Sequence, residues 1–430
     1  MLKSTRRAGL QAGVLGITDQ VLLSSTNLAV GLTLAREMPP ASFGIYVIVF
    51  ALSLICASVQ VALITDPLVV LGSPREGPSR AAYLAAAWRL QLGLSIGLTL
   101  IAAAAAGAAR GVAGAGSELP AALAGLALSV VPLQAQTFIR ALFFVRLQPG
   151  LVLLNDMLLT ALRLGLLAWL AISGNLSTFS VMATAALAAA VAVIAGLVSC
   201  RELRASAPSS FATMWEEHWR YGRWLLATSA AYWGSGQAPA LISSAMIDPV
   251  AAAILKACQY LVAPLNVAFT GLDGVLAPRA ARLRVTRGAD ACRRYLMAVG
   301  AACGTAVVLY SAGLLPVIGP LMSWLYRGQY TGYSAIVALF LLDALFTAVS
   351  RAPMLSLKVA GRTQTIFFTY LAGAAAGVSA LVLLVPTYGV LGAALAAPAS
   401  SGVVLAGLLA VSMAPANEQL ASPAVRAVEP

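Results

Sequence analysis

The chain has 430 residues, of which 60% are hydrophobic and only 10% are charged, and its formal net charge is +12. Apolar stretches fill almost the whole length, which leaves no room for a soluble domain of ordinary size and predicts a polytopic membrane protein. Basic residues beside anionic inner-leaflet headgroups explain the positive charge, so it does not require a nucleic-acid partner.

Twelve apolar stretches are each long enough to be a transmembrane helix. A helix needs about 20 residues to cross a hydrocarbon core of about 30 Å. The expected fold class is therefore an all-α polytopic membrane protein. The predicted spans are 10–34, 42–64, 81–107, 119–141, 150–173, 177–200, 223–245, 249–276, 295–318, 331–353, 364–386 and 389–413.

Lysine and arginine are distributed unequally between alternate connections. With the N-terminus on the cytoplasmic side, the inner segments hold 21 basic residues and the outer segments only Arg36, Arg110 and Arg327. This asymmetry predicts that both termini are cytoplasmic. The first apolar run is long and lacks an obvious small-residue cleavage site, so it is predicted to be a retained span and not a secretory signal.

The longest inner connection, 201–222, divides the spans into six and six. Its sequence RELRASAPSSFATMWEEHWRYG joins a Pro/Ser break to a Trp- and Arg-containing segment that can lie in the membrane interface. We predict that His218, the only histidine, is an interfacial residue there. The predicted organisation is an N-terminal six-helix lobe (1–200), this linker, a C-terminal six-helix lobe (223–413) and a cytoplasmic tail (414–430). Two lobes related by an axis along the membrane normal are known from several transporter folds.

Several kinds of chemistry are not expected. The five cysteines lie in spans or on the inner side, without C-x-x-C spacing or a neighbouring histidine, so neither a disulfide framework nor a metal site is predicted. A G-x-x-x-x-G-K-[ST] phosphate loop does not occur in the sequence, which argues against direct ATP hydrolysis. The short connections cannot form an extramembrane active-site domain. We therefore predict no enzyme, no catalytic residue and no cofactor.

Four segments resemble one known family, in the same order along the chain. They are LAREMPPASFGIYVIVFAL (34–52), LAPRAARLRVTRGADACRRY (276–295), LYRGQYTGYSAIVALFLL (325–342) and PTYGVLGAALA (386–396). The chain is similar through them to the polysaccharide transporters and O-antigen flippases of the multidrug/oligosaccharidyl-lipid/polysaccharide (MOP) exporter superfamily. The segment 35–39, Ala-Arg-Glu-Met-Pro, departs from the usual Leu-Gly-Pro lead-in.

The resemblance implies two six-helix lobes around a central cavity that opens alternately to the two sides. It also implies a flippase of the bacterial inner membrane, which moves polyprenyl-pyrophosphate glycans to the periplasmic leaflet for exopolysaccharide or O-antigen synthesis. The implied partners are the lipid-linked oligosaccharide, membrane lipids, and a glycan polymerase and glycosyltransferases of the same pathway. Two alternatives stay open: an ion-coupled multidrug exporter of the same superfamily, and a membrane-embedded glycan polymerase or ligase.

Ionisable residues inside the spans are the candidate binding residues, because a charge in the bilayer is costly unless it is paired or hydrated. Arg163 lies too deep in the fifth span for easy snorkelling and is the best candidate for binding phosphate. Asp156 lies seven residues earlier on nearly the same helix face, where it orients Arg163, competes with the substrate for it, or forms a structural pair with it. Arg89, Lys256 and Asn27 complete the predicted cavity residues.

Two acids near the middle of their spans are candidates for ion coupling. Asp19 begins a polar face of the first span that also contains Gln20, Ser24 and Asn27. Asp343 lies at similar depth in the tenth span. Either acid is suited to carry a coupled proton or sodium ion, since such a group must be reachable from both sides in turn.

The predicted orientation can be tested by cysteine labelling in intact cells. A membrane-impermeant maleimide should react with Arg327→Cys from outside and with Arg284→Cys only after the membrane is permeabilised, because the basic residues place position 284 inside. The opposite labelling pattern would overturn the orientation and the assignment of every connection.

Overall fold

The structure is a computed structural model that describes residues 2–112, 116–200, 211–359 and 362–413. Every regular element in these ranges is helical, which confirms the predicted all-α fold class. Ten helical segments among the described residues are long and apolar enough to cross a membrane, so the chain is a multi-pass membrane protein. The predicted tail (414–430) and the first half of the predicted linker (201–210) lie outside the described residues.

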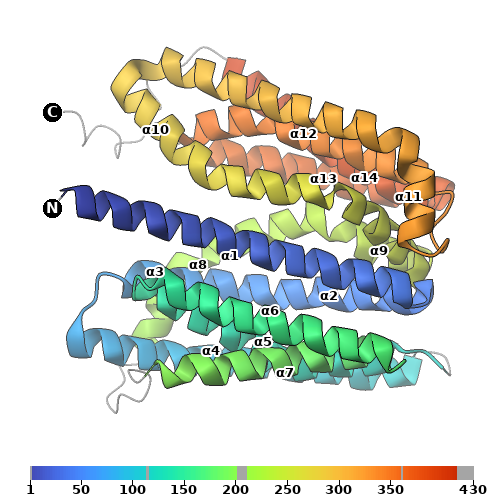
Figure 1. Cartoon of the computed structure of the whole chain (residues 1–430), viewed down its shortest axis with the longest axis horizontal. Helices are drawn as coiled ribbons and strands as arrows, with labels where there is room; N and C mark the ends of the chain where they lie inside the picture. Colours follow the sequence, from blue (N-terminus) through green and yellow to red (C-terminus); the bar gives the residue numbers. More distant parts are fainter. Residues whose placement is uncertain (1, 113–115, 201–210, 360–361, 414–430) are drawn as a thin grey trace. The chain divides into compact units, whose positions relative to one another are not determined.

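The chain divides into two compact units, Met1–Ala230 and Ala231–Pro430, with the division inside one helix. The first unit contains one helix for each of the six N-terminal spans and the start of the next helix (Figure 1). Its elements are α1 (Leu2–Glu37), α2 (Pro40–Gln60), a π-helical turn (Val61–Thr65), α3 (Asp66–Gly72), α4 (Gly77–Val112), α5 (Leu119–Val145), α6 (Pro149–Ile172), α7 (Thr178–Val198) and α8 (Phe211–Gly236).

Local sequence explains where several of these helices begin. Pro40 and Pro149 occupy the first turns of α2 and α6, where a missing N–H breaks no helical hydrogen bond. The Ser177 hydroxyl accepts the backbone N–H of Ser180 at 3.1 Å and the Ser180 hydroxyl accepts that of Ser177 at 2.9 Å, which forms a capping box at the start of α7.

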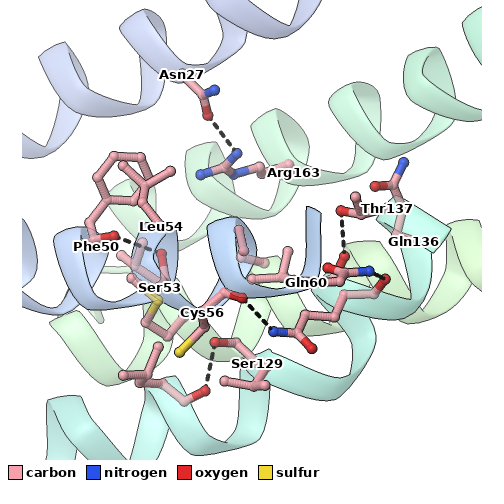
Figure 2. A pocket seen from close by; sticks show the side chains of 18 of the residues that line it. Asn27, Phe50, Ser53, Leu54, Cys56, Gln60, Ser129, Gln136, Thr137 and Arg163 are labelled. Carbon is pink, nitrogen blue, oxygen red and sulfur yellow. Dashed lines mark hydrogen bonds between the residues drawn. The ribbon is translucent and has the colours of Figure 1, made fainter. Parts of the chain in front are cut away.

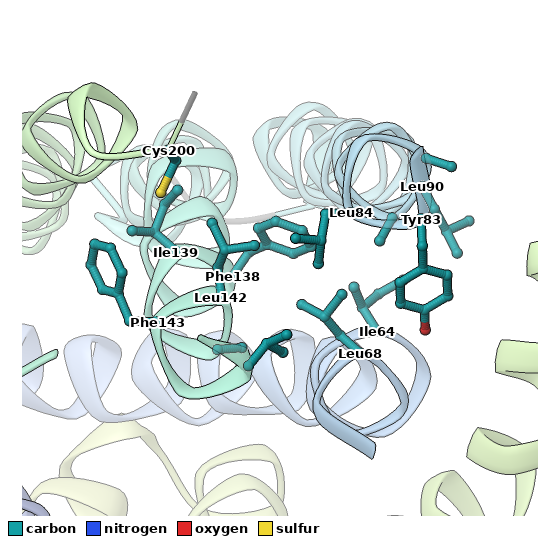
Figure 3. Close-up of a cluster of buried hydrophobic side chains, with 14 of the residues drawn as sticks. Ile64, Leu68, Tyr83, Leu84, Leu90, Phe138, Ile139, Leu142, Phe143 and Cys200 are labelled. Atoms are coloured by element: carbon teal, nitrogen blue, oxygen red, sulfur yellow. The ribbon is translucent and has the colours of Figure 1, made fainter. Parts of the chain in front are cut away.

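The centre of the first unit is α5, which packs against α4 and α7, while α6 packs against α1 and α7. Figure 3 shows the apolar cluster that joins α5 to α4 and to the segment from the π-helical turn into α3. Phe138 and Leu142 of α5 meet Leu84 of α4 and Ile64 and Leu68 of that segment, and all five are 0% exposed. This cluster fixes the irregular end of α2 in the interior of the unit.

In the second unit, two predicted spans, 249–276 and 295–318, belong to one long helical element that kinks at Gly288 (Figure 1). The φ of Gly288 is +82°, a backbone conformation that favours glycine. The helix therefore continues through most of the connection that the sequence placed between the spans. The elements are α9 (Ala238–Met246), α10 (Pro249–Leu314), a 3-10 turn (Leu315–Val317), α11 (Ile318–Leu325), α12 (Ser334–Val359), α13 (Thr363–Tyr388) and α14 (Val390–Met413).

Within this unit, α12 packs against α10 and α14, and α13 packs against α14. The start of α10 is fixed by Asp248, whose carboxylate accepts the backbone N–H of Ala251 at 3.0 Å. This cap sets the depth at which the side chains of α10 enter the unit, including Lys256 two turns further on.

Candidate functional site

A row of polar contacts joins α1 to α6 in the first unit. The hydroxyls of Thr26 and Thr160 lie 3.3 Å apart, and one turn further along α6 the Arg163 guanidinium donates to the amide oxygen of Asn27 at 2.9 Å (Figure 2). Residue numbers rise together along both helices, so α1 and α6 run parallel. That direction is the one expected for the first and fifth spans of a membrane protein.

A buried ion cluster lies at an earlier level of the same two helices. Arg140 of α5 donates through Nη2 to a carboxylate oxygen of Asp19, and its Nε lies 2.7 Å from Oδ2 of Asp156. The side chains of Asp19 and Asp156 are 3% and 0% exposed. Gln136, one turn before Arg140, donates to Oδ1 of Asp156 at 2.7 Å. One guanidinium therefore forms ion pairs with two buried carboxylates, which come from two other helices.

The structure corrects the expected pairing of Asp156 with Arg163. Asp156 binds Arg140, and Arg163 binds Asn27. Seven residues bring two side chains to nearly the same helix face but separate them by about 10 Å along the axis, so each meets a different neighbour. Arg140 lies at the inner end of the predicted fourth span (119–141) and was not among the predicted cavity residues. The sequence signal that marks it is Gln136, four residues earlier on the same face of an apolar helix.

Arg163 and Asn27 line a cavity of about 240 Å³ within the first unit (Figure 2). Among the described residues of its wall, Arg163 carries the formal charge, and aspartate and glutamate do not occur there. The other polar side chains are amides, hydroxyls and one thiol. They are Tyr46, Ser53, Cys56, Gln60, Ser129, Gln134, Gln136 and Thr137.

Buried amides hold the wall of this cavity together across three helices. Gln60 of α2 donates from its side-chain amide to Oε1 of Gln91 at 2.9 Å and to the backbone carbonyl of Gln134 at 2.7 Å. The Gln134 amide donates to the carbonyl of Cys56 at 3.1 Å, and Ser95 donates to Oε1 of Gln134 at 2.7 Å. A connected network of this kind is rigid because each buried group depends on its partners. Sequence reasoning missed it, since single amides on separate helices form no pattern.

The second unit contains its own cavity, of about 670 Å³, which brings Lys256 and Asp343 into one wall together with Arg351. The Lys256 ammonium donates to Oε1 of Gln259 at 3.4 Å. The Arg351 guanidinium donates to the backbone carbonyl of Phe269 at 3.5 Å and stacks over the ring of that residue at 4.8 Å. Arg351 lies at the inner end of the predicted tenth span (331–353), and the structure places it in α12 as a further cation of this cavity.

Arg89 takes a different place from the other predicted cavity residues. It is exposed on α4 and is not one of the residues that line either of these two cavities. The structure therefore groups Arg163 with Asn27, Lys256 with Asp343, and Asp19 with Asp156, and leaves Arg89 apart from all three groups.

Comparisons with solved structures identify the fold of this chain. No protein-family profile and no curated protein sequence matches the chain. An inward-facing multidrug resistance MATE family transporter of the MOP superfamily matches with a TM-score of 0.72 and 12% identity, over 91% of this chain and 93% of its own. The chain has the fold of the MOP superfamily transporters.

Two further solved structures have a similar fold. The lipid II flippase MurJ in an inward closed conformation matches with a TM-score of 0.66 and 12% identity, over 94% of this chain and 86% of its own. A eukaryotic MATE transporter matches with a TM-score of 0.67 and 14% identity, over 96% of both chains. Because a flippase and multidrug transporters share the fold, the fold does not select the substrate.

The shared arginine gives a stability prediction. Arg140→Met leaves Asp19 and Asp156 buried without their cation, and breaking a buried ion pair from one side costs about 3–5 kcal/mol. We expect a clearly lower unfolding temperature for the purified variant in detergent, measured by intrinsic tryptophan fluorescence. The matched control combines Arg140→Met with Asp19→Asn and Asp156→Asn, which removes the unpaired charges and should recover most of the loss. An Arg140→Met protein as stable as wild type would contradict this description of the cluster.

Proposed function

We propose that the chain is a flippase for lipid-linked oligosaccharides. In this proposal it moves a glycan on a polyprenyl pyrophosphate from the cytoplasmic to the periplasmic leaflet of the bacterial inner membrane by alternating access. The protein supplies no chemistry to the substrate. It lowers the cost of bringing phosphates and hydroxyls through a medium that offers neither counter-charges nor hydrogen bonds.

The charge of the two cavities is the observation that supports an anionic substrate. Arg163 is the charged residue on the described wall of the first cavity, and Lys256 and Arg351 outnumber Asp343 on the wall of the second. A pyrophosphate is attracted to such surfaces. An organic cation is repelled by them, and the repulsion is strong where water is scarce. This difference favours the flippase over the multidrug exporter.

The sizes of the two cavities suggest different parts of the substrate. Pockets for drug-sized ligands occupy about 300–1,000 Å³. The first cavity, at about 240 Å³, is smaller than that and suits a compact group such as pyrophosphate beside Arg163. The second, at about 670 Å³, has room for sugars and offers Gln259 and Asn266 to their hydroxyls. A lipid-linked oligosaccharide is made by glycosyltransferases and extended by a polymerase. We propose these enzymes as partners because of the substrate class, and not because of a feature of the cavities.

Transport measurements on Arg163 variants test the substrate class. Arg163→Ala should reduce translocation of a polyprenyl-pyrophosphate glycan in proteoliposomes at least about tenfold, because hydrogen bonds to charged groups contribute about 1.5–3 kcal/mol. Arg163→Lys should restore part of the rate, since lysine keeps the charge but loses the planar fork. Arg110→Ala, an exposed arginine in the last turn of α4, is the matched control.

Two outcomes would contradict the flippase. One is full glycolipid translocation by a folded Arg163→Ala protein. The other is export of cationic dyes by the wild-type protein with no glycolipid translocation, which would favour the multidrug exporter instead.

We further propose that the Asp19, Arg140 and Asp156 cluster couples transport to an ion gradient. With both carboxylates ionised, one arginine leaves the cluster with a formal charge of −1, which is costly away from water. One proton or one sodium ion makes the cluster neutral. Oδ1 of Asp19 is buried and has no hydrogen-bond partner among the described residues, so it is the oxygen available to that cation. Asp343 in the second cavity is the other coupling candidate.

Asparagine variants separate these two candidates. Asp19→Asn should still bind glycolipid but lose the dependence of its transport on an imposed proton or sodium gradient, because asparagine keeps the size and most hydrogen bonding but removes the charge change. Transport is compared in proteoliposomes with and without each gradient. Loss of dependence in Asp343→Asn alone would assign coupling to the second cavity, and full dependence in both variants would exclude both acids.

A further inference from the structure

The end of α2 is irregular at a point where a proline follows. The π-helical turn Val61–Thr65 leads into α3, whose second residue is Pro67. Proline has no backbone N–H, so the carbonyl of Leu63 lacks the donor that an α-helix would place four residues later. Single π-helical turns inside α-helices are frequent at functional sites.

His218 of α8 supplies a donor to this carbonyl. Its Nδ1 lies 2.9 Å from the oxygen of Leu63, and its Nε2 lies 2.9 Å from the hydroxyl of Tyr83. A carbonyl only accepts, so Nδ1 carries the proton, and Nε2 accepts the hydrogen bond that the Tyr83 hydroxyl donates. The sequence predicted an interfacial residue. The structure instead buries the His218 side chain completely, because it has a partner for each ring nitrogen.

The residues one turn to either side of His218 complete a docking face. Met214 is 2% exposed and belongs to the apolar cluster of the first unit. A Cβ added at Gly222 would overlap the carbonyl oxygen of Ala62 and come within 3.1 Å of the Cα of Leu63. Only glycine therefore lets α8 approach the π-helical turn this closely. Met214, His218 and Gly222 follow one another at four-residue spacing and form one face of the helix, which we call the strap face.

Other contacts at the same level are weaker. The Arg75 guanidinium lies 2.9 Å from a carboxylate oxygen of Glu217 and stacks over the ring of Tyr83 at 3.8 Å. The side chains of Arg75 and Glu217 are 29% and 33% exposed, and ion pairs that water reaches contribute little. Among the described residues, the hydrogen bond from His218 to the carbonyl of Leu63 is therefore the main polar link between α8 and the π-helical turn.

This turn is directly connected to the cavity that contains Arg163. Gln60 is the last residue of α2 before the turn, lines that cavity and is fully buried. Its side-chain amide donates to Gln91 and to the carbonyl of Gln134, so its position decides whether the amide network of the wall stays closed. A displacement of Leu63, three residues along the chain, is passed to Gln60 through the backbone.

We propose that His218 is a positioning residue that holds the π-helical turn, and through it Gln60, in the wall of the Arg163 cavity. The strap face thus lets α8 control the shape of a cavity that it does not line. The proposal rests on the proposed function only in taking this cavity as the place where substrate phosphate binds. Its physical content, the coupling of α8 to the cavity wall, is measured without any substrate.

Cys56 provides a native probe in that wall. It lines the cavity one turn before Gln60 and is partly buried, whereas the other four cysteines are buried. Alkylation by a small maleimide is followed at each cysteine of the purified protein by peptide-resolved mass spectrometry. We expect His218→Ala to increase the alkylation rate of Cys56 about tenfold, the size of change expected when an ordinary buried hydrogen bond no longer holds a local opening closed. The other four rates should stay as in wild type.

Three further variants make the test specific. His218→Asn retains an amide donor near the position of Nδ1 and should restore most of the protection of Cys56. Gly222→Ala pushes α8 off the turn without changing His218 and should increase Cys56 alkylation as His218→Ala does. Trp219→Ala alters an exposed neighbour on the same helix and should leave the rate unchanged.

Each other outcome has a definite meaning. An unchanged Cys56 rate in folded His218→Ala and Gly222→Ala overturns the proposal, and if His218→Ala does not fold, Gly222→Ala decides. A parallel increase at all five cysteines shows that His218 only stabilises the fold, which also overturns it. A selective increase at Cys56 in a protein that does not translocate glycolipid leaves the proposal standing and rejects the proposed function.

Discussion

The first unit depends on one arginine that is shared by two buried acids. Arg140 comes from α5, the helix at the centre of the unit, and it meets Asp19 from α1 and Asp156 from α6. A buried ionised carboxylate is stable only where a cation or hydrogen-bond donors contact it. The contacts of Arg140 therefore fix how α1, α5 and α6 are aligned along their axes. The hydroxyl contact of Thr26 with Thr160 continues the same alignment.

The shared arginine also determines the charge of the neighbouring cavity. Because Arg140 engages both acids, Arg163 is left with neutral hydrogen-bond partners, the amide oxygen of Asn27 and the hydroxyl of Tyr46. An amide oxygen orients a guanidinium but does not neutralise it, so the cavity keeps its positive charge. If Asp156 were paired with Arg163 instead, the same residues would form a nearly neutral wall. The positive charge of the cavity thus depends on a pairing between residues that do not line it.

The sequence predicts the membrane architecture well because hydrophobicity is a property of each segment alone. All twelve predicted spans have a helical counterpart among the described residues, even where the structure adds a kink at Gly288 or a π-helical turn after Gln60. The depth of Arg163 in the bilayer is likewise a prediction that comes from counting residues along one span. Both predictions need only the helical rise and the thickness of the bilayer.

Contacts between helices are what the sequence could not supply. Asp156 and Arg163 share a face of α6. The sequence of that helix does not show that Arg140, which comes from α5, lies closer to Asp156. The residues around His218 have the composition of an interfacial segment. Its burial depends on the carbonyl of Leu63, more than 150 residues earlier, which lacks its usual helical donor because Pro67 has no N–H. Such partners are chosen by packing, which periodicity within a segment does not encode.

The two units are alike in span number but not in electrostatics. In the first unit Asp19 and Asp156 bind Arg140 and do not line the cavity. In the second unit Asp343 lies on the cavity wall with Lys256 and Arg351. A cation that enters the second cavity therefore meets an acid directly, while one that reaches Asp19 must enter a buried ion cluster. The six-plus-six symmetry stays a prediction from the sequence, and the electrostatics of the two cavities do not follow it. If the chain transports an anionic lipid against a cation gradient, the two units contribute different steps. In the first unit Arg163 contacts Asn27 while both acids contact Arg140, whereas in the second unit Asp343 lies on the same cavity wall as Lys256 and Arg351.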